Sequence, residues 1–319
     1  MPTPKLETVI QDIFTHEELS DKKLDLINIG AEKVVFKVEG ISDRVFKIPR
    51  DAFSRRIAFV TNDTEKDKKG CDREVIEYQM AYWRDEMGLE DEAKEIFGPE
   101  HFLERGIFRV TVPITKSLLT KYWGEERTKN IPDDFHEDIK MLAESQEKLD
   151  VLMNQDDYMP FAVYLVTVKD FRPSPEYSLE EGLSITRNKI NEQIIIMEGM
   201  ISDEYLGPVL RKLVEDIICY TKQTGRMIDI FGRDNLILFV KEGCMDFEQD
   251  TATDYDYKFI EFTLPGNKDH WMTTFEEDKE NGLQFVRHYY SYYYFIHKMG
   301  EKLGVVDNLE PGDLCYFKG

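Results

Sequence analysis

The sequence predicts an α+β protein with a small sheet in its N-terminal part and a mostly helical C-terminal part. Three observations predict this class. Short apolar segments separated by turns fill residues 24–50, and apolar residues close to helical spacing run through residues 203–224. A further helical pattern, dense in aromatic residues, occupies residues 282–303. We therefore expect two lobes, residues 1–165 and residues 166–319.

The N-terminal elements begin with a predicted hairpin. Leu26–Val38 reads as a strand, a turn containing Gly30, and a second strand. Arg44–Pro49 is a third apolar strand, with Lys47 inside it. Residues 72–95 follow with a helical pattern. This helix carries Glu74, and Glu77 lies about one turn later on a neighbouring side.

The middle of the chain contains two predicted strands with a charged segment between them. Residues 107–119 alternate as a strand does, and residues 161–170 form an apolar strand that opens into a polar segment. Residues 121–160 between them are polar and charged, with a predicted helix over 133–152. We interpret residues 121–160 as an insertion or an edge element.

The C-terminal part contains the polar residues of greatest chemical interest. The helix over 203–224 ends at Gly225, a common helix stop. A polar loop with Asp229 and Asn235 follows and runs directly into the apolar strand 236–240. A later strand, Tyr257–Phe262, carries Glu261 near its end.

These segments bring several oxygen ligands toward one point. A loop acid and amide, a strand, a turn, and a strand ending in an acid supply the ligands that Mg²⁺ prefers, usually together with phosphates. Asp229 lies among apolar neighbours, where a carboxylate is costly unless it is paired or bound to metal. The alternative interpretation is a tight turn, which suits Asp234 better than Asp229.

Taken in order, these segments resemble the protein-kinase-like fold. The hairpin at Gly30 is similar to the glycine-rich loop, and Lys47 is similar to the lysine of the V-A-I-K pattern. Glu74 resembles the helical glutamate that pairs with that lysine. The loop with Asp229 and Asn235 resembles the catalytic loop, and residues 257–262 resemble the metal-binding segment that follows it.

The resemblance implies a phosphotransferase that uses ATP and Mg²⁺. It implies that Gly30, Lys47 and Arg233 contact the nucleotide phosphates, with Lys47 held by Glu74. Asn235 and Glu261 would hold the metal. Asp229 would orient or deprotonate an acceptor hydroxyl, whether on a protein or on a small alcohol.

The departures from the family pattern keep a second function open. The hairpin has a single glycine where the family has three. Asp229 stands one residue earlier than the family's catalytic Asp, in whose place this chain has Ile230. Glu261 replaces the Asp of D-F-G. The alternative is therefore a pseudokinase, acting as a nucleotide-sensing or protein-binding module. A third possibility is an α+β protein that resembles kinases by accident.

Several residue roles also have two interpretations. Lys47 could be an edge-strand lysine with a solvated head, and Glu77 could replace Glu74 as its partner. Arg233 could pair with Asp229 or contact a phosphate. Asp234 is a turn residue or a substitute base.

Composition excludes some partners and favours others. The 63 acidic and 41 basic residues give a formal net charge of −22. Such a field repels nucleic acids and anionic membranes and attracts a cationic acceptor, although solubility alone explains an acidic surface. The four cysteines form no C-x-x-C pair, so we expect neither a zinc site nor a disulfide framework. We expect a soluble, cytoplasmic protein. The aromatic run Phe285–Ile296 is better explained as helical core than as a cation cage.

Overall fold

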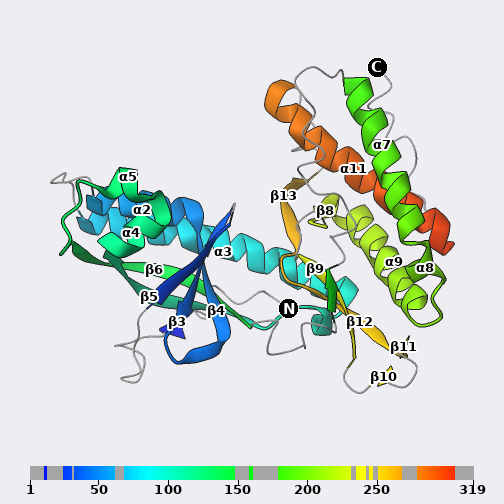
Figure 1. Ribbon diagram of the computed structural model, residues 1–319, viewed down its shortest axis with the longest axis horizontal. Coiled ribbons are helices and arrows are strands. Elements are labelled where there is room, and N and C mark those ends of the chain that lie inside the picture. The colour runs from blue at the N-terminus through cyan, green and yellow to red at the C-terminus, as the bar shows by residue number, and fades with distance from the viewer. Residues whose placement is uncertain are drawn as a thin grey trace. The chain divides into compact units, whose positions relative to one another are not determined.

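A computed structural model describes most of the chain, which folds as two compact units (Figure 1). The first unit consists of residues 1–89 and 103–152, and the second consists of residues 90–102 and 153–319. The sequence predicted a single boundary between two lobes at residue 165, whereas the second unit also includes residues 90–102 and 153–165. The residues that the structure describes are 11–12, 24–30, 32–61, 68–147, 158–160, 179–230, 235–241, 244–246, 251–267 and 279–305.

The first unit is built on an antiparallel sheet of five strands. Its strands lie in the order β5-β6-β4-β3-β2, and the two-residue strand β1 (Gln11–Asp12) adds in parallel to β5. The predicted strand–turn–strand–strand pattern of residues 24–50 is confirmed. The five strands are β2 (Leu24–Ile29), β3 (Lys33–Val38), β4 (Ile41–Pro49), β5 (Arg105–Thr115) and β6 (His136–Glu147).

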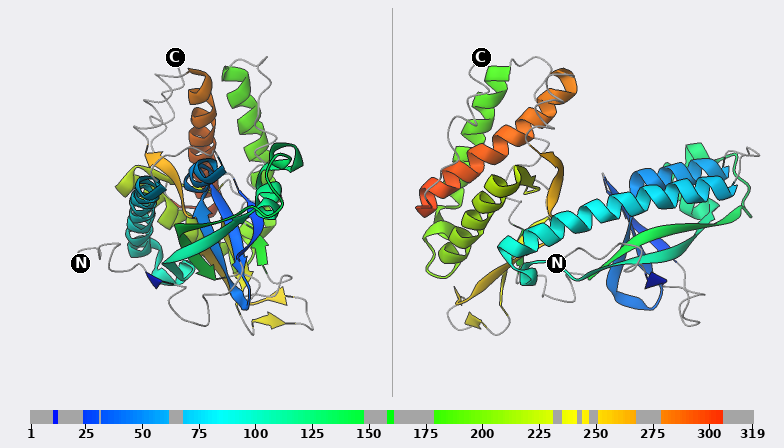
Figure 2. Two further views of the ribbon diagram at one scale, coloured as in Figure 1. Left: turned by 90° about the vertical axis from the view of Figure 1, so that its left-hand side faces the viewer. Right: turned by 180° about the vertical axis from the view of Figure 1, so that it is seen from behind.

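One face of this sheet is apolar and is covered by short helices (Figure 2). Because side chains alternate along a strand, Phe36, Phe46 and Val110 share this face. Phe53 packs edge-on against Phe36, with 5.5 Å between the ring centroids. The covering helices are α2 (Arg50–Thr61) and α4 (Lys116–Trp123), and the single turn α5 (Glu125–Thr128) follows α4.

The long helix α3 (Lys68–Phe97) confirms the predicted helix over 72–95 and packs along the sheet through Gln79 and Trp83. Strand β4 pairs with β6 only over Glu144–Glu147, which leaves the backbone of Leu142 without a strand partner on that side. The Gln79 amide fills this gap. Its Nε2 donates to the Leu142 carbonyl at 2.7 Å, and its Oε1 accepts from the Leu142 N–H at 2.9 Å.

Strand β6 corrects the interpretation of residues 121–160. The predicted helix over 133–152 is wrong, because residues 136–147 form a strand that lies between β5 and β4. This strand is neither an insertion nor an edge element. Its Lys, Leu, Ala, Glu and Gln residues are good helix formers, but pairing on both sides overrides that preference.

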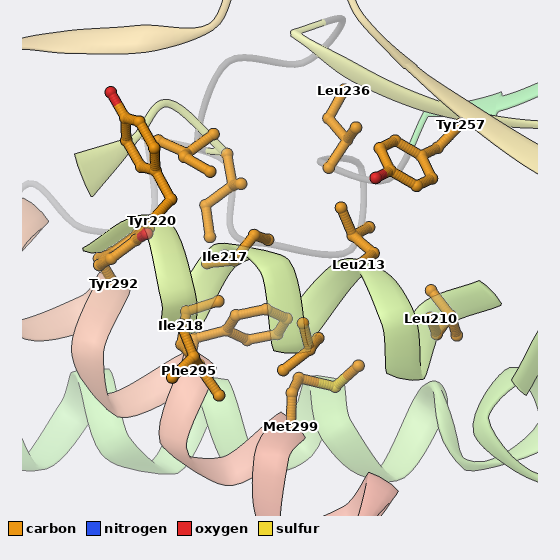
Figure 3. Close-up of a cluster of buried hydrophobic side chains, with 14 of the residues drawn as sticks. Leu210, Leu213, Ile217, Ile218, Tyr220, Leu236, Tyr257, Tyr292, Phe295 and Met299 are labelled. Atoms are coloured by element: carbon orange, nitrogen blue, oxygen red, sulfur yellow. The ribbon is translucent and has the colours of Figure 1, made fainter. Parts of the chain in front are cut away.

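The second unit is largely helical. Helix α9 lies at its centre, with Leu236 and Tyr257 on one side and Phe295 and Met299 of α11 on the other (Figure 3). Helix α11 also packs against α7. The helices are α7 (Leu179–Ile196), α8 (Glu198–Ser202), α9 (Leu206–Thr224) and α11 (Lys279–Leu303), with the short turn η1 (Pro99–His101) after α3.

One predicted helix end and part of one predicted helix face can be compared with the structure. Helix α9 stops at Gly225, whose φ of 68° is the left-handed conformation typical of a helix C-cap. Along the described part of the aromatic run in α11, Tyr290, Tyr292, Tyr293 and Phe295 are buried core residues. The core interpretation is therefore confirmed for residues 290–296, and the side chains of residues 285–289 lie outside the described ones.

Short strands complete the second unit. Strand β9 (Leu236–Val240) pairs on one side with β12 (Tyr255–Phe259) and on the other with β7 (Tyr158–Pro160). Separately, β8 (Arg226–Ile228) pairs with β13 (Thr263–Asn267). A small hairpin joins β10 (Met245–Asp246) to β11 (Thr251–Ala252).

Two further features are judged by which residues the structure describes. The predicted strand 161–170 lies outside the described residues. Among the helices that the structure describes, none is both long enough and apolar enough to cross a membrane.

Candidate functional site

The loop that carries Asp229 and Asn235 is joined to the segment that carries Glu261. The Asn235 carbonyl accepts hydrogen bonds from the N–H groups of Ile260, at 2.7 Å, and Glu261, at 3.3 Å. At the other end of the loop, the Asp229 N–H donates to the Phe262 carbonyl at 3.1 Å. The structure therefore brings these predicted site residues together through their backbones.

Strand pairing explains why the two segments meet. Leu236 lies opposite Phe259 where β9 pairs with β12, and Ile228 lies opposite Thr263 where β8 pairs with β13. The connection from β8 to β9 begins at Asp229 and ends at Asn235, and residues 260–262 connect β12 to β13. The two ladders therefore place these two described ends beside residues 260–262.

A cluster of aromatic rings supports the Glu261 segment. Phe259 and Phe262 are buried, and their centroids lie 5.0 Å apart. Phe97, near the end of α3, lies 5.0 Å from Phe259 and 5.7 Å from Phe262. Tyr220 of α9 lies 5.1 Å from Phe262. Because both residues that flank the Ile260–Glu261 pair are locked in the core, the backbone at Glu261 has little freedom to move.

The residues present are suitable for a hard divalent cation. Asp229 and Glu261 are half-buried carboxylates, and Asn235 adds an amide oxygen. In the part of the chain that the structure describes, no group of three or more His, Cys, Asp or Glu side chains is placed to hold a metal. Mg²⁺ fits a smaller set, because it keeps several waters and phosphate oxygens and needs only one or two carboxylates. Arg233 and Asp234 lie outside the described residues.

Gly30 lies in the β2–β3 hairpin, where the backbone approaches itself closely. Its N–H donates to the Lys33 carbonyl at 2.8 Å, and a Cβ at Gly30 would lie 3.1 Å from that oxygen. Arg50 holds the turn from outside. Its Nη1 donates to the Gly30 carbonyl at 3.1 Å, and its backbone N–H donates to the Glu32 carbonyl at 2.7 Å. A side chain at Gly30 would crowd this tight turn. Contact between Gly30 and a phosphate remains a prediction.

Lys47 is buried, and the carboxylate opposite it is Glu144. These residues form a cross-strand pair where β4 meets β6, so their side chains lie on the same face of the sheet. The predicted partner, Glu74, is exposed on α3, and so is the alternative, Glu77, whose carboxylate accepts from Arg73. The structure therefore places a different glutamate beside the lysine.

Glu144 is the centre of a buried group of charges. Its side chain is 1% exposed, and its carboxylate forms ion pairs with Arg105 at 3.1 Å and with Lys33 at 3.6 Å. Burial opposes ionisation, but the charges of Arg105, Lys33 and Lys47 prevail and lower the pKa of Glu144 to about 2. Glu144 is therefore an anion at neutral pH.

Lys33 connects this group to α3. Its Nζ donates to Glu86 Oε2 at 3.0 Å and lies 5.4 Å from the centre of the Trp83 ring. Glu86 in turn accepts from the Tyr82 hydroxyl at 2.7 Å. Helix α3 thus reaches the charged face of the sheet through Glu86 rather than through Glu74.

Sequence reasoning missed these residues for identifiable reasons. Glu144 lies in the segment predicted as a helix, where no strand neighbour could be assigned. Lys33 directly precedes an apolar strand and reads as a turn residue. The sequence signal for both residues was a charged side chain within two positions of a buried strand segment. Charged residues are common at such positions, so this signal does not identify a site.

A second missed cluster lies at the end of α3. The His101 ring stacks on Tyr257, with 3.9 Å between centroids and 4° between ring planes. His101 Nδ1 lies 3.1 Å from the Tyr257 carbonyl oxygen and 3.2 Å from Asp256 Oδ1. These contacts attach η1 to β12, next to the strands that position Glu261.

Comparison of the chain with known protein families, with curated proteins and with solved structures finds no match.

Proposed function

We propose that the protein is an ATP- and Mg²⁺-dependent phosphotransferase of divergent kinase-like type. The observation that carries the proposal is the double hydrogen bond from the N–H groups of Ile260 and Glu261 to the Asn235 carbonyl. It joins the two residues that the kinase resemblance assigns to the metal, although they are far apart in sequence. Phosphoryl transfer depends mainly on such positioning and on charge neutralisation.

The order of elements supports the same proposal. In the first unit, a hairpin with Gly30 and a strand with Lys47 come first, and the long helix α3 and two further strands come later, with α2, α4 and α5 between them. In the second unit, helix α9 leads into the loop at Asp229. Fold-level similarity alone does not establish activity, so the residues must be tested.

The proposal assigns a role to each residue. Asn235 and Glu261 hold the metal, and Asp229 orients or deprotonates the acceptor hydroxyl. Lys47, with Gly30 and Arg233, contacts the nucleotide phosphates. When bound, Mg²⁺ supplies positive charge that neutralises the phosphate oxygens. The net charge of −22 favours a small or cationic acceptor over nucleic acid or an anionic membrane.

The first experiment is isothermal titration calorimetry with ATP, with and without Mg²⁺. The wild type is compared with Glu261→Ala and with Glu192→Ala, which removes an exposed carboxylate from α7 in the same unit. We expect Mg²⁺ to tighten ATP binding to the wild type and to Glu192→Ala. Glu261→Ala should lose about tenfold or more of the metal-dependent affinity, which corresponds to ~1.4 kcal/mol.

A pseudokinase is the second candidate, and the exposed position of Glu74 favours it. A nucleotide-sensing module would bind ATP equally well with and without Mg²⁺, and Glu261→Ala would change nothing. If the protein is folded by circular dichroism and binds no ATP at all, the phosphotransferase is rejected. A protein-binding module then remains.

A further inference from the structure

Charged side chains of alternating sign connect α3 to Lys47 in the first unit. Glu86 of α3 bonds Lys33 of β3 at 3.0 Å, and Lys33 lies 3.6 Å from the Glu144 carboxylate of β6. Glu144 lies opposite Lys47 of β4 in the strand register. The sequence of charges from the helix to the lysine is therefore negative, positive, negative, positive.

The strand register places the charged residues of this group that belong to the sheet on one face of it. Val35 lies opposite Lys47, so Lys33, two residues earlier on β3, shares the face of Lys47. Ile107 lies opposite Glu144, so Arg105, two residues earlier on β5, shares it too. This face carries the small cluster of Trp83, Ile107 and Leu142 to which α3 contributes.

Burial makes these charges dependent on one another. Lys33, Lys47 and Glu144 are all buried, and a buried ion is stable only with charged or hydrogen-bonding partners. Removal of the Glu144 charge would leave Lys33, Lys47 and Arg105 next to one another without their shared anion. The ammonium group of Lys47, on its flexible stem, would then lose the attraction of the Glu144 carboxylate.

We propose that Glu144 is the residue that positions Lys47 for phosphate contact, and that Glu86 links α3 to this arrangement through Lys33. The proposal rests on the proposed function and deepens it. It replaces the helical glutamate expected from sequence with a strand glutamate and an intermediate lysine. Glu144 and Glu86 are positioning residues, and neither is assigned contact with the nucleotide.

The experiment compares the affinities for ATP and for adenosine, which lacks phosphates. Both ligands are titrated calorimetrically into the full chain with Mg²⁺ present. The variants are Glu144→Gln, Glu86→Gln and, as the matched control on the same helix, Asp85→Asn at an exposed position. We expect Glu144→Gln to weaken ATP binding about tenfold and Glu86→Gln to weaken it less, with adenosine affinity unchanged in both. Asp85→Asn should bind both ligands as the wild type does.

A double-mutant cycle with Lys47→Met tests whether the effect passes through Lys47. In the Lys47→Met background, Glu144→Gln should cause no further loss of ATP affinity, because the group that it positions is gone. If Glu144→Gln does not fold, as judged by circular dichroism, the same cycle is made with Glu86→Gln. Glu86 is more exposed, and its removal leaves the Glu144 ion pairs in place.

Three results would overturn the proposal. ATP affinity could be unchanged in Glu144→Gln and Glu86→Gln, or ATP and adenosine affinities could fall equally, as a general structural defect predicts. An additive effect of Glu144→Gln and Lys47→Met would also contradict it. Failure of the wild type to bind ATP has a different meaning, since it rejects the proposed function itself.

Discussion

Individual buried charges in this protein are held by partners that come from distant parts of the chain. Glu144 is ionised because residues from β3, β4 and β5 surround it. His101 is held between the carbonyl of Tyr257 and the carboxylate of Asp256, more than a hundred residues away. The ionisation of each residue depends on partners that only the tertiary structure brings close. Substitution of either residue therefore tests those contacts.

The His101 contacts predict a stability that depends on pH. Burial alone lowers the pKa of His101, but the hydrogen bonds to Asp256 and Tyr257 and the charges of Asp256 and Glu100 outweigh it, so the pKa lies above the usual 6.5. A raised folded-state pKa means that the stabilisation is complete below about pH 6.5 and is lost as pH rises through the folded value. Burial also opposes ionisation of Asp256, but its hydrogen bond from His101 prevails and holds the pKa of Asp256 below its usual 3.8.

We therefore expect His101→Gln to reduce the free energy of unfolding more at pH 5.5 than at pH 9, by on the order of 1 kcal/mol. Urea unfolding at the two pH values measures this difference. His136→Gln is the control, because His136 is an exposed histidine that also lies beside an aspartate. If His101→Gln lowers the free energy of unfolding equally at both pH values, the positive charge of His101 does not contribute to stability.

At the scale of elements, α3 is attached to the sheet of the first unit through the buried side chain of Gln79. Its Gln79 side chain substitutes for a missing strand by bonding both backbone groups of Leu142. Gln79 is fully buried, so water cannot replace these bonds. The attachment of the helix to β6 therefore depends strongly on one amide.

Gln79→Leu is expected to lower the free energy of unfolding by about 2 to 5 kcal/mol, because two buried backbone groups would each lose a partner. Urea or thermal unfolding followed by circular dichroism measures the loss. Gln223→Leu, at an exposed position of α9, is the matched control and should change stability little. A loss below about 0.5 kcal/mol in Gln79→Leu would mean that the two Leu142 groups find other partners.

The strand ladders of the second unit have a comparable role for the proposed metal ligands. Neither Asn235 nor Glu261 lies within a strand, yet the pairing of β9 with β12 determines their separation. The buried rings of Phe259 and Phe262 then fix the segment between the two ladders. Functional positions on connections between rigid elements are common in proteins.

At the scale of the whole molecule, net charge is the dominant electrostatic property. With a formal charge of −22, repulsion among surface carboxylates opposes the compact state. We expect the melting temperature to rise as NaCl increases from about 0.05 M to about 0.3 M, because the Debye length falls below the spacing of many surface charges.

Thermal unfolding followed by circular dichroism tests this expectation. Sucrose at matched osmolality is the control for effects that do not involve charge. A melting temperature that falls with NaCl would show that the surface ion pairs, which salt also screens, outweigh the general repulsion.

Local patterns alone determined the elements that depend on local physics. The hairpin and third strand over residues 24–49, the end of α9 at Gly225 and the buried aromatic face of α11 follow from periodicity and helix-stop chemistry. The order of segments also predicted that Asn235 and Glu261 would come together. Hydrophobic periods and glycine conformations act over a few residues, so one sequence displays them.

Only the tertiary structure decided the position of β6 and the partner of Lys47. The residues of β6 favour a helix in isolation, and only pairing with β5 and β4 makes them a strand. Once β6 is a central strand, its register places Glu144 opposite Lys47, while Glu74 faces outward on α3. Cross-strand neighbours are set by register between segments about a hundred residues apart, and that information is not present in the local pattern of either segment.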